Sequence, residues 1–168
     1  MSTIRVMILM GSRSDLDAMS EAFRILKQFH IPYEARALSA HRTPDSVRQC
    51  MEGLEERGCS VVIAGAGGAA HLAGVCASHT ALPVIGVPMK TSALGGLDSL
   101  LSTVQMPRGI PVATTAIGGS GAYNAALLAV QILALSDEAL RSELHAFRKA
   151  QSEKVLEDSL IECEAAQS

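Results

Sequence analysis

The sequence predicts an α/β fold in which helices cover both faces of a parallel sheet, giving a three-layer α/β/α sandwich. Five apolar runs recur along the 168 residues, and each is followed by a turn and a helical pattern. Repeated alternation of strands and helices is typical of a parallel sheet, and continuously apolar strands are typical of one buried on both faces. The length is that of one ordinary domain, so we expect a single domain over residues 1–168.

The expected elements follow one another with short connections. We predict strands over residues 4–10, 33–38, 60–64, 83–87 and 111–117. We predict helices over residues 15–29, 44–57, 69–78, 97–104 and 122–135, and a last one from about 137 to 156. The helix over 122–135 is apolar almost all round, so we expect one face to cover the sheet and the other to contact another subunit. The last helix is charged and amphipathic, which fits either a solvated surface helix or a subunit contact.

Composition and charge favour an oligomer that binds a small molecule. Hydrophobic residues make up 48% of the chain and charged residues 18%, against roughly 25% charged residues in an average soluble domain. A monomer of this composition would expose apolar surface, so we expect a homo-oligomer. The formal net charge of -3 argues against a nucleic-acid surface, which concentrates Lys and Arg.

The cysteines and the N-terminal apolar run indicate a cytoplasmic protein with reduced thiols. The spacing of the cysteines matches neither a disulfide framework nor a zinc site. They are Cys50, Cys59, Cys76 and Cys163. The apolar run over residues 4–10 is too short to span a membrane and lacks a signal-peptide cleavage site. We expect no membrane partner.

Motifs for metal or triphosphate chemistry do not occur in the sequence. It contains no H-E-x-x-H, G-x-x-x-x-G-K or G-x-S-x-G pattern. We therefore expect neither a metal nor a cofactor. In an open parallel sheet the ligand lies beyond the carboxyl ends of the strands, so the chemistry is expected in the five strand-to-helix loops. These are GSRSD (11–15), SAHRTP (39–44), AGGAAHL (66–72), PMKTSALGG (88–96) and GGSGAYN (118–124).

The GSRSD loop has the features of an anion site. Its backbone N–H groups and the Ser12 and Ser14 hydroxyls can bind a phosphate at the start of the following helix. The Asp15 carboxylate beside them is suited to accept hydrogen bonds from ribose hydroxyls. The alternative is that Ser14 or Asp15 only caps the helix. A nucleotide-like ligand would use all three side chains.

The SAHRTP loop holds the candidate acid-base residue. Thr43 and Pro44 fit an N-cap and a first helical position, which places His41 and Arg42 at the rim of the ligand crevice. A histidine titrates near neutral pH and can move a proton, and a guanidinium binds phosphate or carboxylate. Position alone also allows a solvated or capping histidine.

The AGGAAHL loop resembles a dinucleotide-binding turn only in spacing. Gly65, Gly67 and Ala70 match G-x-G-x-x-G/A, but that motif belongs after the first strand and needs an acidic residue about twenty positions on. Neither condition is met here. Gly67 instead allows the backbone to approach a ligand closely, and His71 either points toward the crevice or packs locally.

Long strings in these loops resemble the PurE family, in particular its class I members. The strings are MGSRSD, SAHRTPD, IAGAGGAAHL, GVP, LDSLLSTVQMPRGIPVAT, AIG and NAALLAVQIL. The resemblance covers nearly the whole chain. It implies a flavodoxin-like five-stranded fold, a homo-octamer, and conversion of N5-carboxyaminoimidazole ribonucleotide to 4-carboxyaminoimidazole ribonucleotide in purine biosynthesis without metal, ATP or cofactor.

Carried over by position, the resemblance also implies residue roles. His41 would protonate the exocyclic nitrogen as the carbamate breaks, and would recover the ring proton after the aminoimidazole carbon attacks the trapped CO2. The ribose and phosphate end would be bound by Ser12, Asp15 and Arg42, and the aminoimidazole and carboxylate by Ser39, Ala66 and Gly67.

Alternatives and departures accompany this resemblance. The class II relatives carboxylate aminoimidazole ribonucleotide directly with CO2, and SAHRTP rather than SAHKT favours class I. A carboxylase of another nucleotide and a non-catalytic nucleotide-binding module are more distant alternatives.

The sequence departs from the family's HLPGM at Ala73 and Val75, and again around Gly118–Gly121. We expect the missing proline to loosen the third loop.

Overall fold

The computed structural model describes residues 3–162 and contains a five-stranded parallel sheet with the strand order β2-β1-β3-β4-β5. The strands are β1 Val6–Met10, β2 Tyr33–Ala37, β3 Val61–Ala66, β4 Val84–Pro88 and β5 Ala113–Thr114. All four neighbouring pairs are parallel. The three-layer, flavodoxin-like prediction is therefore confirmed.

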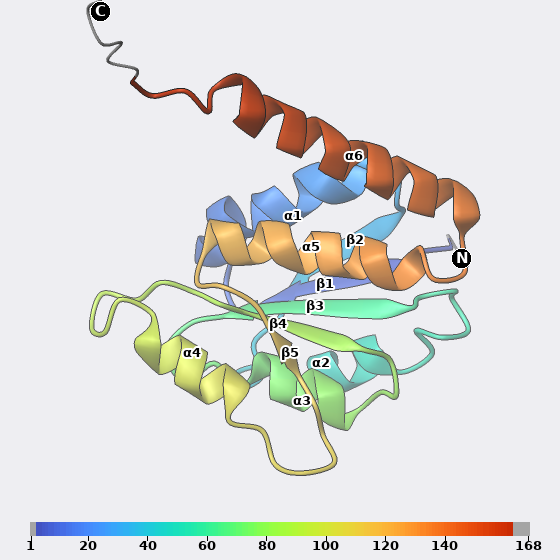
Figure 1. Cartoon of the computed structure of the whole chain (residues 1–168). Coiled ribbons are helices and arrows are strands. Elements are labelled where there is room, and N and C mark those ends of the chain that lie inside the picture. Colours follow the sequence, from blue (N-terminus) through green and yellow to red (C-terminus); the bar gives the residue numbers. More distant parts are fainter. Residues whose placement is uncertain (1–2, 163–168) are drawn as a thin grey trace, which may run out of the picture.

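Helices cover both faces of the sheet. They are α1 Leu16–Gln28, α2 Pro44–Met51, α3 Leu72–Ser78, α4 Leu97–Val104, α5 Gly119–Leu133 and α6 Glu138–Glu157, with a 3-10 turn η1 Arg13–Asp15 before α1. Helices α1 and α5 lie on one face with α6 outside them, and α2, α3 and α4 lie on the other (Figure 1). Among the described residues, no helix has the length and apolar character needed to cross a membrane.

The central strands divide their side chains between two cores because successive residues of a strand point to opposite faces. In β1, Val6 and Ile8 pack toward α1 and α5, whereas Met7 and Leu9 pack toward α2 and α3. Each of these side chains is fully buried, and full burial contributes about 1.5–3 kcal/mol per large apolar side chain. Burial on both faces explains the continuous apolar run in this strand.

The edge strands differ from the predicted pattern. Strand β2 is largely exposed and carries Glu34 and Arg36, whose side chains form an ion pair at 2.5 Å. The expectation of a strand buried on both faces is wrong here, since every residue of this edge strand is half-buried or exposed. Charged residues on an edge strand also discourage pairing with other chains. At the opposite edge, β5 pairs over two residues instead of the predicted seven.

Three helix boundaries were misplaced by the sequence pattern, each beside a glycine with positive φ. Helix α2 ends at Met51 instead of residue 57, because Glu52 is extended and Gly53 has a φ of +68°. Helix α3 begins at residue 72 rather than 69, after Gly68, whose φ is also +68°. Helix α5 begins three residues early because Gly118 is its N-cap.

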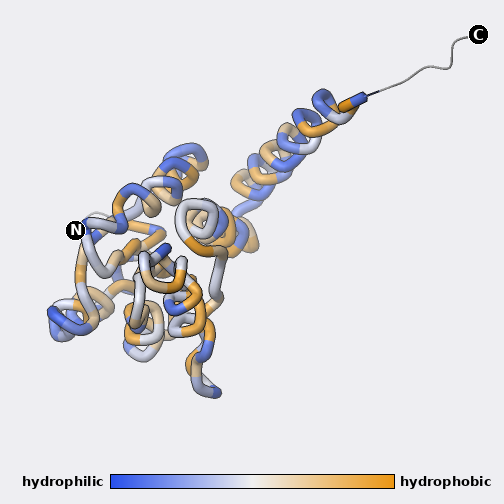
Figure 2. The backbone as a smooth tube through the Cα atoms, turned by 90° about the vertical axis from the view of Figure 1, so that its left-hand side faces the viewer, coloured by the Kyte–Doolittle hydropathy of each residue, from blue (hydrophilic) through white to orange (hydrophobic). Residues whose placement is uncertain are grey.

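The outer face of α5 is covered in part by the chain itself. The first half of α6 packs on it, with Leu140 buried and with Phe147 in an edge-to-face contact with Phe29 of α1. The expectation that this face contacts another subunit is therefore incomplete. The second half of α6 projects from the body of the molecule (Figure 2), and Val155 and Leu156 there are 71% and 67% exposed.

Candidate active site

The candidate site lies where the chain order reverses in the sheet. From β1 the chain passes to β2 on one side and then crosses to β3 on the other, which makes this edge a switch point where ligands bind in open α/β sheets. Met10, the last residue of β1, pairs with Ala37 and Gly65. The loops after these strands therefore leave the sheet at one level and surround a cavity of about 440 Å³.

All nine residues predicted from the sequence line this cavity. They are Ser12, Ser14, Asp15, Ser39, His41, Arg42, Ala66, Gly67 and His71. The loops after β1, β2, β3 and β4 contribute to it. The loop over residues 118–124 does not, because β5 lies at the far edge, and its residues line a separate small hollow beside Glu21.

In the first loop, Ser12 and Asp15 form a capping box. The Ser12 hydroxyl accepts a hydrogen bond from the Ser14 N–H at 3.2 Å, and the Asp15 carboxylate accepts one from the Ser12 N–H at 3.2 Å. Burial raises the pKa of the Asp15 carboxyl, although the hydrogen bonds from Ser12 and Ser14 act in the opposite direction. The capping role and the position on the cavity wall therefore coexist.

In the second loop, a closed set of hydrogen bonds holds His41 and Arg42 in place. The Thr43 N–H and hydroxyl both donate to the Ser39 carbonyl, at 2.8 Å and 3.0 Å, and the Arg42 N–H donates to the Ser39 hydroxyl at 3.2 Å. The Arg42 guanidinium donates to the Gly11 carbonyl at 3.3 Å. Thr43 is the N-cap of α2 as predicted, but its hydroxyl braces the loop instead of capping the helix.

Two histidines meet at the centre of the site. His41 Nε2 lies 2.9 Å from His71 Nδ1, and the two rings are nearly perpendicular at 87° with centroids 5.0 Å apart. Such a bond requires one ring nitrogen to donate and the other to accept, so the two facing nitrogens share one proton. His71 is the N-cap residue of α3 and makes no capping bond with its side chain. Of the two alternatives for His71, the structure shows the one that faces the crevice.

The third and fourth loops form the remaining wall. A Cβ on Gly67 would lie 3.3 Å from the Met89 Cβ, which is a tight contact, so the backbone here passes close to the start of the loop that follows β4. Lys90 and Thr91 also line the cavity, and neither was predicted from the sequence. Lys90 is the only lysine in the five loops, which is the signal that could have identified it.

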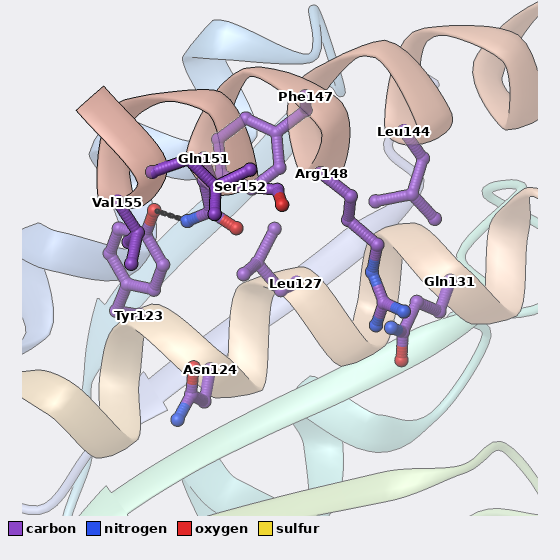
Figure 3. Close-up of a pocket in the computed structure, with 11 residues that line it drawn as sticks. Tyr123, Asn124, Leu127, Gln131, Leu144, Phe147, Arg148, Gln151, Ser152 and Val155 are labelled. Carbon is purple, nitrogen blue, oxygen red and sulfur yellow. Dashed lines mark hydrogen bonds between the residues drawn. The ribbon is translucent and has the colours of Figure 1, made fainter. Parts of the chain in front are cut away.

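A larger cavity of about 620 Å³ lies between α5 and α6, away from the four loops that surround the candidate site (Figure 3). It is lined by apolar side chains such as Tyr123, Leu127 and Phe147. Among the described residues, Arg148 is the only charged one that lines it. With no histidine or carboxylate beside this arginine, the cavity is not the candidate for catalysis. Within residues 3–162, no cluster of three or more His, Cys, Asp or Glu residues could hold a metal ion.

The comparison with protein families agrees with this geometry. The sequence pattern of the family described as AIR carboxylase matches residues 5–154, which include every loop around the cavity. The chain belongs to the AIR carboxylase, or PurE, family. A crystal structure of Treponema denticola PurE superposes with a TM-score of 0.84 at 30% identity, over 94% of this chain and 98% of that one.

Three similar PurE relatives carry the name N5-carboxyaminoimidazole ribonucleotide mutase. The protein of Haemophilus influenzae is 53% identical over 93% of this chain and 95% of its own length. That of Bacillus subtilis is 55% identical over 90% of this chain and 94% of its own length. That of Pyrococcus horikoshii is 57% identical over 89% and 84%. The similarity therefore spans nearly the full length of these relatives.

Proposed function

We propose that this PurE chain converts N5-carboxyaminoimidazole ribonucleotide to 4-carboxyaminoimidazole ribonucleotide in purine biosynthesis. The observation that carries the proposal is the hydrogen-bonded pair of His41 and His71 inside a cavity whose wall also holds Arg42 and the Ser12 loop. This arrangement offers a proton-transferring group beside an anion site. The mutase relatives at 53–57% identity support the same reaction.

The substrate fits the cavity with its phosphate at the first two loops. The hydroxyls of Ser12 and Ser14 and the Arg42 guanidinium bind the phosphate, and the bond from the guanidinium is the strongest because it joins two charged groups. Asp15 accepts hydrogen bonds from the ribose hydroxyls. The aminoimidazole and its carboxylate then lie against Ser39, Ala66 and Gly67, next to the two histidines.

In the reaction, His41 serves first as an acid and then as a base. As the carbamate N–C bond breaks, His41 gives its proton to the exocyclic nitrogen, and CO2 is released inside the cavity. The ring carbon of the aminoimidazole then forms a C–C bond to the CO2, and His41 recovers the proton that this carbon loses. No atom is gained or lost overall. His71 holds the His41 ring in place through their hydrogen bond.

Retention of the CO2 requires walls that do not open during the reaction. The loop over residues 67–72 forms one wall, and the loop over residues 92–96, which is exposed from 92 to 95, can close over the ligand as a lid. In this chain Ala73 lies in the first turn of α3 and is buried. The residue that replaces the family's proline thus belongs to the helix that follows the wall.

The experiment that tests this proposal supplies the purified chain with the N5-carboxylated substrate in the absence of ATP, and measures the 4-carboxylated product. The second candidate function is direct carboxylation of aminoimidazole ribonucleotide, which the family's description as AIR carboxylase favours. Product formed from aminoimidazole ribonucleotide and bicarbonate, and not from the carbamate, would select that function. Tight binding of nicotinamide dinucleotides without turnover would select a nucleotide-binding module.

We further propose that the single domain of residues 1–168 assembles as a homo-octamer in the cytoplasm without a nucleic-acid or membrane partner. Exposed apolar side chains on α4 support assembly, since Leu97, Leu101 and Val104 are 51%, 48% and 47% exposed on one helix. Free thiols support a reducing compartment: Cys59 and Cys76 are buried, and burial raises the pKa of Cys76 to about 12. Cys163 lies outside the described residues.

A further inference from the structure

Two serines of α4 hold both backbone polar groups of Gly68 in the third loop. The Gly68 N–H donates to the Ser99 hydroxyl at 2.9 Å, and the Ser102 hydroxyl shares its one proton between the Gly68 carbonyl at 3.1 Å and the Asp98 carbonyl at 2.8 Å. Ser99 is fully buried, so this hydroxyl has no access to water as an alternative partner. A buried polar group of this kind needs a hydrogen bond within the protein.

Gly68 is the point at which the third loop changes direction. Its φ of +68° is in the left-handed region, which glycine adopts without strain. Strand β3 ends two residues before it, and α3 begins four residues after it. Between them, the N–H groups of Ala70 and His71 donate to carbonyls only two residues back, at 2.8 Å each. The path from the cavity wall to His71 therefore contains no regular secondary structure.

Helix α4 also holds the neighbouring loop. The Thr91 hydroxyl lies 2.8 Å and 3.0 Å from the two oxygens of the Asp98 carboxylate. Asp98 is in the first turn of α4, where a negative charge is favoured by the helix dipole. The first two turns of this helix thus contact both loops on the β3 and β4 side of the cavity.

We propose that Ser99 and Ser102 form a clamp on Gly68 that positions His71 and keeps the cavity wall closed while CO2 is free. This inference rests on the proposed mutase function. Both serines are positioning residues, because they act through the loop and do not touch the substrate. The clamp consists of the two hydrogen bonds to Gly68 and nothing else.

A loosened clamp has a consequence that a general loss of stability does not have. Once the N–C bond has broken, CO2 is neutral and is retained only by the walls around it. A wall that opens more often lets CO2 escape, so that aminoimidazole ribonucleotide is released instead of the carboxylated product. Partial unfolding lowers the amount of active enzyme, but it leaves the ratio of the two products unchanged.

The test compares Ser99→Ala and Ser102→Ala with the unaltered full chain. The expected result is an increase of about tenfold in aminoimidazole ribonucleotide released per 4-carboxylated product, since one lost hydrogen bond corresponds to roughly that factor. Thr103→Val is the matched control. Thr103 is nearly as buried, and its hydroxyl donates at 2.8 Å only to the Ser99 carbonyl within α4. The Thr103→Val variant therefore controls for the loss of the hydrogen bond from the Ser102 hydroxyl to the Asp98 carbonyl, which also lies within α4.

Amide hydrogen exchange over residues 67–71 gives a second measurement that does not depend on activity. Faster exchange there in both serine variants, with unchanged exchange in Thr103→Val, supports the clamp. Unchanged exchange in the serine variants overturns it. If the ratio of aminoimidazole ribonucleotide to 4-carboxylated product is unchanged in both serine variants, the role in CO2 retention is overturned. If the unaltered chain does not turn over the carbamate at all, the proposed function fails, and the exchange data still decide whether the clamp exists.

Discussion

At the residue scale, the proposed chemistry rests on two imidazole rings that are joined by a hydrogen bond. His41 and His71 come from loops thirty residues apart, yet their ring nitrogens lie 2.9 Å from each other. The sequence located both residues because each follows a strand within a short, distinctive string. It could not show that they meet, because that contact depends on the order of the strands in the sheet.

His41→Asn is expected to lower kcat by at least about 100-fold, because general acid-base catalysis contributes roughly 10²–10⁴-fold. The asparagine amide is similar in size to the imidazole and still forms hydrogen bonds, but it cannot gain or lose a proton near neutral pH. Substrate affinity should change little, which calorimetry with the product can measure. His79→Asn, at the exposed end of α3, is the control and should retain full activity. Normal turnover in His41→Asn would remove this residue from the mechanism.

Asp15→Asn is expected to raise the melting temperature at pH 7 and to have a smaller effect at pH 4. Burial raises the pKa of the Asp15 carboxyl in the folded chain. The folded state therefore binds more protons than the unfolded state, and stability falls as the pH rises from the unfolded pKa through the folded pKa. The uncharged amide avoids that loss at neutral pH. Calorimetry at the two pH values measures the change in melting temperature. An equal change at pH 7 and pH 4 would contradict the raised pKa of Asp15.

At the element scale, the sequence predicted each helix and strand but not all of their ends. The pattern of apolar residues continues past Met51, because Leu54 is also buried, although the helix has already ended. The same limit applies at β2, whose alternating charged residues fit an edge strand that only the sheet order reveals. Thr91 was missed because it belongs to no recognisable chemical pattern, and Lys90 because its one signal, being the only lysine in the five loops, was not used.

Gly121→Ala in α5 is expected to lower the free energy of unfolding by at least about 3 kcal/mol, at the upper end of overpacking costs. An added Cβ would lie 1.6 Å from the Ala116 carbonyl oxygen. Gly119→Ala in the same helix is the matched control, since its Cβ would meet only ordinary contacts at 3.6 Å or more. That control should be neutral or slightly stabilising. Urea denaturation of both variants measures the difference, and equal stabilities would contradict the packing described for α5.

At the scale of the whole molecule, the low content of charged residues and the exposed apolar residues both favour the proposed oligomer. The composition led us to expect an oligomer, and the structure leaves Leu94 and three residues of α4 exposed by 47% or more. Sequence alone could not locate this surface, because the helical pattern of α4 does not distinguish the side that faces the sheet from a side that faces another subunit.

Leu101→Glu is expected to break the proposed octamer into smaller species, because a carboxylate cannot be buried in an apolar contact without a partner. Light scattering coupled to size exclusion measures the mass. Gln28→Glu, at an exposed position on α1, adds the same charge away from the apolar surfaces and should leave the mass unchanged. An octamer that persists in Leu101→Glu would place the interface elsewhere.

Isotopic labelling of the carboxyl carbon shows directly whether the CO2 stays in the cavity during the reaction. The chain is given N5-carboxyaminoimidazole ribonucleotide labelled isotopically in its carboxyl carbon, in unlabelled bicarbonate buffer without ATP. The proposed mechanism predicts 4-carboxyaminoimidazole ribonucleotide that retains the label, because the CO2 never leaves the cavity. Unlabelled product, or product formed only from aminoimidazole ribonucleotide and bicarbonate, would contradict it.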